Sequence, residues 1–254
     1  MTEVEPQDNS ISLRRDLAIA CRVLAHRGLV EDILGHISWR LDDQRVLVRC
    51  RGPEESGLRF TQSADIRVVD PQTSSVTDDE TGTYKPPSEL PIHLAVFNAR
   101  PDVSCVVHAH PPSVVAASLA RLPLVPLFGA YNIPAARLAA NGIPTFPRSA
   151  LIRTRELGVD MVRSLGDAPG VVLTGHGVVT TGTTVQQAVL RALQIDALAR
   201  MTMHVHSAGA QVRPIPAEDL AELPDLGSTF NETTLWRHHL AALAADGFML
   251  EESR

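Results

Sequence analysis

Residues 103–112 read Val-Ser-Cys-Val-Val-His-Ala-His-Pro-Pro, and the fold prediction starts from this stretch. The apolar run 103–107 predicts a buried strand, and the two closing prolines end it because proline cannot continue the hydrogen-bonded ladder. Side chains two residues apart on a strand project from the same face. His108 and His110 would therefore leave the end of this strand together, and two imidazoles so placed can bind one metal ion.

A third histidine occupies a similar place on a second predicted strand. The apolar run 171–173 leads into Thr-Gly-His-Gly, which contains His176. Sites in α/β folds tend to lie at the ends of buried strands. A lone histidine beside an apolar run is usually a core or surface residue, whereas three at strand ends favour a metal site. Three histidines with an open fourth position are typical of a catalytic divalent metal.

Composition narrows the class of protein. The 254 residues are 44% hydrophobic and 20% charged, which is ordinary for a globular protein with a substantial core. A net charge of −6 argues against a general electrostatic grip on nucleic acid or on an anionic membrane. The N-terminus is acidic and polar, unlike a signal peptide, and the three cysteines are widely spaced. These features predict a cytoplasmic protein with reduced thiols, with neither nucleic acid nor membrane as a partner.

The order of apolar periodicities predicts one α/β domain over residues 11–210. A flexible leader, 1–10, precedes it, and a C-terminal extension with a terminal helix, 211–254, follows. The predicted strands are 46–48, 66–69, 103–107 and 171–173, and residues 34–40 are predicted as a turn leading into a further strand. Capping residues and apolar spacing predict helices at 12–28, 89–99, 113–121, 154–165 and 184–204, with a last one from Thr229.

Glu89 is the candidate acid or base. It follows Ser88, the predicted N-cap of a helix that begins at Glu89, and the helix dipole stabilises a carboxylate there. A helix over 89–99 that turns back at Pro101 would bring Glu89 beside His108. A carboxylate there can coordinate the metal or exchange protons with a bound substrate. An ordinary first-turn glutamate is the alternative interpretation.

Four segments resemble, in order, the motifs of the class II aldolase/adducin superfamily over residues 12–205. They are Gly-His-Ile-Ser-Trp-Arg (35–40), Pro-Ser-Glu-Leu-Pro-Ile-His-Leu (87–94), His-Ala-His-Pro (108–111) and Gly-His-Gly-Val-Val (175–179). The resemblance implies an α/β fold, a three-layer α/β/α sandwich around a largely antiparallel central sheet. It also implies a homotetramer with sites near the subunit interfaces.

The same resemblance assigns roles to the site residues. It implies that His108, His110 and His176 hold one divalent metal ion per subunit, and that Glu89 is the catalytic acid/base. Three imidazoles suit zinc and also manganese, iron or cobalt, so the sequence leaves the metal open.

Departures from the sugar-phosphate members of the superfamily cluster at the phosphate contacts. His36 stands where those enzymes usually carry asparagine, and Pro87-Ser88 replaces their serine pair. The turn 61–64 reads Thr-Gln-Ser-Ala in place of Thr-Pro-Ser-Gly. Three altered contacts to one phosphate favour the branch that decarboxylates hydroxylated aromatic carboxylates, such as dihydroxyphthalate or hydroxypyridine dicarboxylate.

A lyase of this kind would take a small-molecule carboxylate, whose anionic groups require hydrogen-bond donors. The candidate substrate contacts are His36, Ser38, Ser88, Arg40 and Tyr131, with Arg153 and Arg155 as further arginines. Two alternatives stay open at this point. One is a metal-dependent aldolase or epimerase on a small, unphosphorylated hydroxy-carbonyl compound, and the other is a non-catalytic, adducin-like interaction module.

Overall fold

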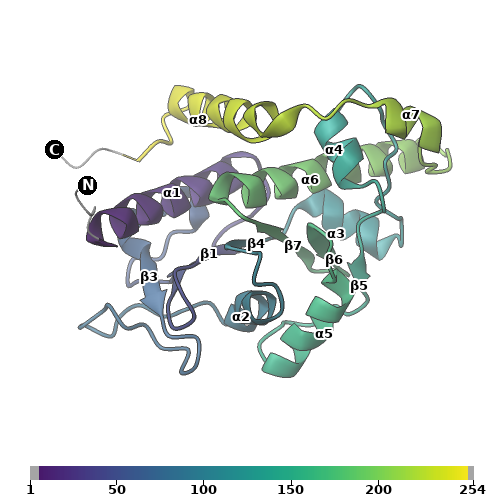
Figure 1. Cartoon of the computed structure of the whole chain (residues 1–254). Coiled ribbons are helices and arrows are strands. Elements are labelled where there is room, and N and C mark those ends of the chain that lie inside the picture. The colour runs from purple at the N-terminus through teal and green to yellow at the C-terminus, as the bar shows by residue number, and fades with distance from the viewer. Residues whose placement is uncertain (1–5, 251–254) are drawn as a thin grey trace.

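A seven-stranded sheet forms the centre of residues 6–250, the part of the chain that the computed structural model describes (Figure 1). Its order is β3-β2-β1-β4-β7-β6-β5, and every neighbouring pair is antiparallel except β5 and β6. The largely antiparallel sheet that was predicted is confirmed. The strands are β1 (His36–Arg40), β2 (Val46–Arg49), β3 (Ile66–Val69), β4 (Cys105–Ala109), β5 (Thr145–Phe146), β6 (Gly170–Leu173) and β7 (Gly177–Gly182).

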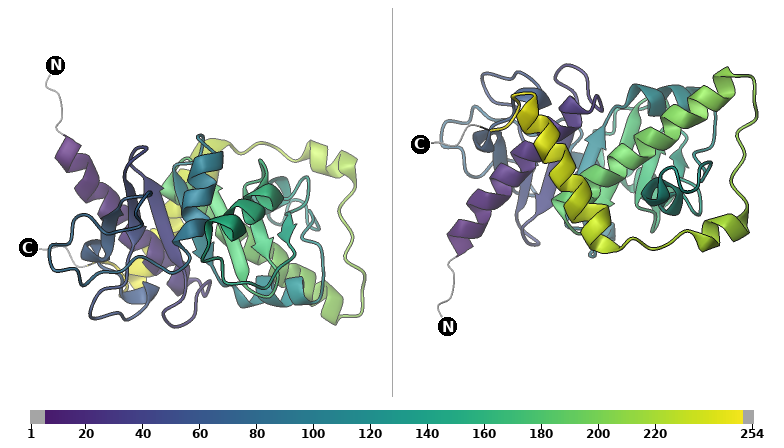
Figure 2. Two further views of the ribbon diagram at one scale, coloured as in Figure 1. Left: turned by 90° about the horizontal axis from the view of Figure 1, so that it is seen from below. Right: turned by 90° about the horizontal axis from the view of Figure 1, so that it is seen from above.

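Helices cover both faces of the sheet and complete the predicted three-layer sandwich. The long helices α1 and α6 cover one face, with α8 outside them, and α2 and α5 cover the other (Figures 1 and 2). Within residues 6–250, no helix is both long and apolar enough to cross a lipid bilayer. The helices are α1 (Pro6–His26), α2 (Leu90–Ala99), α3 (Pro112–Leu119), α4 (Ile133–Leu138), α5 (Arg155–Leu165), α6 (Val185–Ser207), α7 (Ala217–Glu222) and α8 (Leu235–Ala245).

Strand alternation on β4 decides where its histidine points. Val107 and its neighbours two residues away, Cys105 and Ala109, pack into the core under α1 and α6. Val106 packs into the opposite core, under α2 and α5. His108, two residues from Val106, therefore projects toward the start of α2. All five strand residues are buried, as the predicted apolar run requires.

The two ends of the chain differ in part from the prediction. Helix α1 begins at Pro6, so residues 6–10 are helical and not a flexible leader, while residues 1–5 lie outside the described part. At the other end, π-helical turns over Thr229–Thr234 lead into α8, which packs on α1 with Trp236 and Leu243 buried. The proposed boundary at 210/211 stays a prediction.

Local capping signals account for the better-predicted helices. The Thr154 side chain accepts a hydrogen bond from the Leu157 amide at the start of α5, and Thr184 does the same for Gln187 at the start of α6. Such caps satisfy amides that lack a partner in the first helical turn. Short elements carry weaker signals, and α4, α7 and β5 were not predicted. The six-residue strand β7 was not predicted either.

Candidate metal centre

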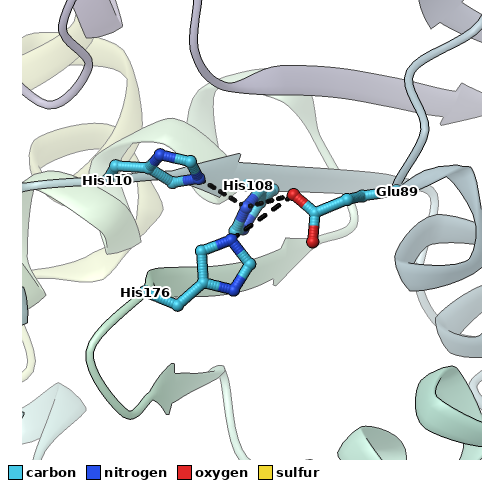
Figure 3. A group of neighbouring side chains, drawn as sticks. All are labelled: Glu89, His108, His110 and His176. Carbon is cyan, nitrogen blue, oxygen red and sulfur yellow. Dashed lines mark hydrogen bonds and ion pairs between the residues drawn. The ribbon is translucent and has the colours of Figure 1, made fainter. Parts of the chain in front are cut away.

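Four side chains from three parts of the fold converge on one point (Figure 3). His108 lies on β4, His110 lies just beyond its end, and His176 lies in the turn between β6 and β7. Glu89 reaches them from the residue before α2. One ligand atom from each of the four lies within 4.8 Å of the others. The structure therefore brings together the three predicted ligands and the predicted acid/base.

The separations within this group of four, the histidine–glutamate cluster, fit one small cation. The Nε2 atoms of His108 and His110 are 2.8 Å apart. Glu89 Oε2 lies 3.4 Å from Nε2 of both His108 and His176. Ligand atoms around a tetrahedral zinc ion, bound at about 2.0–2.1 Å, are separated by about 3.3 Å. Imidazole and carboxylate donors at this spacing fit one first-row divalent metal.

Hydrogen bonding and burial prepare the imidazoles for this role. His108 Nδ1 lies 3.1 Å from the Val178 carbonyl oxygen and donates to it, which leaves a lone pair on Nε2. Burial, reinforced by the neighbouring histidines, lowers the pKa of His110 to about 3. A ring with so low a pKa is neutral at pH 7, and the neutral form is the one that binds metals.

Glu89 is held from both sides. Its Oε1 accepts a hydrogen bond of 2.9 Å from the Ile152 amide, while Oε2 faces His108 and His176. Burial acts to raise the pKa of this carboxyl, but the attraction of His108 and His176 outweighs burial, and the net shift is downward. Glu89 itself is the N-cap residue of α2, and its side chain makes no capping bond. The expected cap by Ser88 is therefore wrong, since the helix begins at Leu90.

Gly177 permits the close approach of the two strands that carry the ligands. A Cβ atom at this position would lie 2.3 Å from the Ala109 carbonyl oxygen and 2.9 Å from Cδ2 of His110. Real Cβ atoms essentially never come so close to a backbone oxygen. Glycine at position 177 is thus needed for packing at the end of β4.

A second group of polar side chains lies directly beside the cluster. His36 pairs with His108 across β1 and β4, and their ring centroids are 4.9 Å apart. His36 Nδ1 lies 2.6 Å from His93 Nε2, and His93 Nδ1 lies 2.5 Å from the Ser38 hydroxyl. Burial lowers the pKa of His93 to about 3 and holds that of His36 well below its usual range. Both rings are therefore neutral.

Two of the predicted substrate contacts are corrected by this arrangement. Ser38 is fully buried and bonded to His93, so its hydroxyl is not available to a substrate. The Arg40 guanidinium donates to the carbonyl oxygens of Phe97 and Arg100, at 2.7 and 2.8 Å. It thus binds the C-terminal end of α2, while Glu89 precedes its N-terminal end, about 15 Å away for a ten-residue helix.

His36 is buried, whereas the remaining predicted contacts, Ser88, Tyr131, Arg153 and Arg155, lie on the surface. Ser88 is exposed next to Glu89, in a position open to a ligand. Tyr131 is 79% exposed and lines a separate hollow with Phe230 and His239, so this chain does not bring it to the histidine–glutamate cluster. Arg153 is exposed next to Ile152, on the loop that holds Glu89. The roles of Ser88 and Tyr131 stay predictions.

His93 is the residue whose part in the site the sequence reasoning missed. It stands in the motif 87–94 but was not predicted as a site residue. Its spacing of four from Glu89 places both side chains on one face of α2. That spacing was a usable signal, because a residue one helical turn after Glu89 lies on the same side of α2 as the metal cluster.

The fold and this cluster together define a known class. Residues 15–203 match the Class II Aldolase and Adducin N-terminal domain family, more than half of the chain. The chain belongs to this family.

Particular relatives within the family are similar along most of their length. The chain is 51% identical over 233 residues to a 3,4-dihydroxyphthalate decarboxylase of Arthrobacter keyseri, covering 91% of this chain and 94% of that protein. It is 49% identical over 230 residues to a protein of the same name from Terrabacter sp. (strain DBF63), covering 91% and 96%. Among solved structures, an aldolase II superfamily protein from Pseudomonas syringae aligns with a TM-score of 0.79 at 21% identity, covering 97% of each chain.

Proposed function

We propose that this protein is a divalent-metal-dependent decarboxylase of a hydroxylated aromatic carboxylate, with 3,4-dihydroxyphthalate as the first candidate substrate. The observation that carries the proposal is the convergence of three imidazole Nε2 atoms and one carboxylate. The relatives from Arthrobacter keyseri and Terrabacter support the substrate class, since they match over nine-tenths of the chain. The altered phosphate contacts at His36 and 87–88 argue in the same direction.

The reaction breaks the bond between a ring carbon and its carboxylate, whose electron pair stays on the ring. A divalent cation held by His108, His110 and His176 would supply positive charge to stabilise that electron pair. Glu89 Oε2 faces the cluster and is the group that accepts a proton from the ring hydroxyl and delivers one to the ring carbon. The Ile152 amide holds the other oxygen and keeps the carboxylate in place. One solvent proton is consumed overall.

Phthalates carry two adjacent carboxylates, so one of them stays on the ring. His36, beside His108, and the exposed Ser88, beside Glu89, are the proposed contacts for this remaining group. The exposed Arg153 adds positive charge on the same loop as Ile152. A carboxylate is bound best by several such donors.

The proposal includes the finer features expected from the sequence. We propose one zinc, manganese, iron or cobalt ion per subunit and a homotetramer with sites near its interfaces. Leu119 and Leu151, 64% and 52% exposed, support such an interface, because Leu119 lies against the turn of His176 and Leu151 precedes Ile152. A role in the catabolism of aromatic compounds in the cytoplasm completes the proposal, and the three free, buried cysteines fit a reducing compartment.

The test offers 3,4-dihydroxyphthalate to the protein loaded with zinc, manganese or cobalt, and measures released carbon dioxide and the aromatic product. We expect equimolar carbon dioxide and 3,4-dihydroxybenzoate, since loss of the carboxylate next to the 3-hydroxyl gives that isomer. His110→Ala serves as the control without a complete cluster. Cleavage of a small ketose with no carbon dioxide from any ortho-hydroxy acid would instead establish the aldolase alternative.

A further inference from the structure

Ser38, His93 and His36 form a continuous hydrogen-bonded chain that ends beside the histidine–glutamate cluster. The two links are 2.5 Å, from the Ser38 hydroxyl to His93 Nδ1, and 2.6 Å, from His93 Nε2 to His36 Nδ1. Ser38 and His93 are fully buried, and His36 is 5% exposed. The hydrogen-bonded chain therefore lies inside the protein and meets the site only at His36.

One hydrogen occupies each link, and the direction of the links is coupled. Of two ring nitrogens 2.6 Å apart, one must donate a hydrogen and the other must accept it with a lone pair. Within one neutral imidazole, a hydrogen on one nitrogen leaves the other as an acceptor. The direction chosen at Ser38 is thus passed through His93 to His36.

The Ser38 hydroxyl settles that direction. Among the residues that the structure describes, its sole hydrogen-bond partner is His93 Nδ1. A buried hydroxyl hydrogen that finds no acceptor costs free energy, so the hydroxyl donates to His93. The hydrogen of His93 then lies on Nε2 and is donated to His36 Nδ1. The remaining hydrogen of His36 must lie on its own Nε2.

His36 Nε2 is the one ring nitrogen of this hydrogen-bonded chain that is open to a ligand. This nitrogen makes no hydrogen bond within residues 6–250, and protein atoms do not enclose it fully. Its ring packs against the His108 ring at a centroid separation of 4.9 Å. An N–H group is therefore presented at the edge of the cluster, where a bound substrate would lie.

We propose that Ser38 and His93 are positioning residues that keep a hydrogen on His36 Nε2, which donates it to the carboxylate that the reaction leaves on the ring. This inference rests on the proposed function for the identity of the anion. The opposite direction of the hydrogen bonds would present a lone pair to the carboxylate and repel it. The retained carboxylate is the better partner, because the departing one must lose its charge and is not helped by a bond that stabilises that charge.

The first test reads the hydrogen positions directly. Protein labelled with 15N-histidine and loaded with zinc is examined by two-bond proton–nitrogen correlation, with His36→Gln used to assign the signals. We expect His36 with a protonated Nε2 and a bare Nδ1. A protonated Nδ1 with a bare Nε2 would overturn the inference, whether or not the protein turns over any substrate.

The second test separates binding from chemistry. Ser38→Ala removes the hydroxyl that sets the direction, and we expect the KM for 3,4-dihydroxyphthalate to rise by about 10-fold or more with metal content unchanged. Thr180→Val is the matched control, because it removes a buried hydroxyl that donates to the Ala188 carbonyl and lies outside the hydrogen-bonded chain of Ser38, His93 and His36. Equal KM values for these two variants would contradict the inference.

A pair of variants at position 93 covers the case in which Ser38→Ala does not fold. In His93→Gln the amide can accept from Ser38 and donate to His36, so we expect a KM within about 3-fold of the unmodified protein. His93→Leu can do neither, and its KM should rise as in Ser38→Ala. Similar KM values for the glutamine and leucine variants would refute the positioning role. If no carbon dioxide is released by the unmodified protein, the proposed function fails, and the nitrogen signals still decide the direction of the hydrogen bonds.

Discussion

Replacing Glu89 by glutamine separates proton transfer from metal binding. The amide oxygen of glutamine can still accept the Ile152 N–H that Glu89 Oε1 accepts at 2.9 Å. The amide nitrogen then takes the place of Oε2, which lies 3.4 Å from Nε2 of His108 and His176. Shape and anchoring are retained, while the ability to accept and deliver a proton is lost.

The expected loss follows from general acid–base catalysis, whose removal costs about 100-fold or more in rate, about 2.7 kcal/mol in the barrier. Turnover of 3,4-dihydroxyphthalate is measured at saturating substrate, together with metal content by elemental analysis. The matched control is Glu156→Gln, an exposed first-turn glutamate of α5. A kcat within about 3-fold of the unmodified protein would refute the proton-transfer role, and loss of metal would instead identify Glu89 as a ligand.

Three further outcomes follow from the geometry. His110→Ala should lose bound metal and turnover while its circular dichroism spectrum is retained. It is a better test than His108→Ala, because His108 is fully buried and hydrogen-bonded to Val178, so its loss would also disturb the fold. Metal that stays bound in His110→Ala would contradict the set of ligands. Gly177→Ala should lower the free energy of unfolding by at least about 2 kcal/mol in urea titration, whereas Gly129→Ala, with its nearest atoms at 3.9 Å, should change it little. Burial lowers the pKa of His239 to about 4. Between about pH 6.5 and pH 4 the unfolded chain therefore binds a proton at this residue and the folded chain does not, so the free energy of unfolding decreases as the pH falls through this range. Between pH 7 and pH 5, His239→Gln should therefore lose about 2 kcal/mol less unfolding free energy than the unmodified protein. An equal loss in the two proteins would show that folding does not lower the pKa of His239.

The centre of the site was predictable from local spacing. His108 and His110 flank the end of an apolar run, and alternation along a strand fixes their common side without knowledge of distant residues. Glu89 required one more step, the return of a helix onto the following strand. His176 was a candidate from its place after the apolar run 171–173, and the family resemblance assigned it to the same metal as His108. Its approach to His108 depends on the pairing of β4 with β7, which no local pattern shows.

The errors at Ser38 and Arg40 have a physical cause. Residues two apart on β1 project from the same face of the sheet, so the sequence places His36, Ser38 and Arg40 on the face of the site. Each residue advances about 3.4 Å along a strand, which puts Arg40 about 14 Å from His36. The distance of each β1 side chain from the metal centre, and the α2 group that it contacts, depend on how α2 packs on the sheet. The contact between Ser38 and His93 joins residues 55 apart in the chain, and no local sequence pattern predicts it.

Helix α2 carries His93 in its first turn and has Glu89 as its N-cap residue, so one rigid helix positions both side chains. Rotating or sliding that helix would displace the reacting carboxylate and the neighbour of His36 by similar amounts. Catalytic rate and anion affinity are therefore mechanically tied, and a substitution beneath α2 should damage both at once. New substrate preferences would arise more readily through changes on β1 or in the exposed loops, where one contact can be altered while the acid/base group keeps its place.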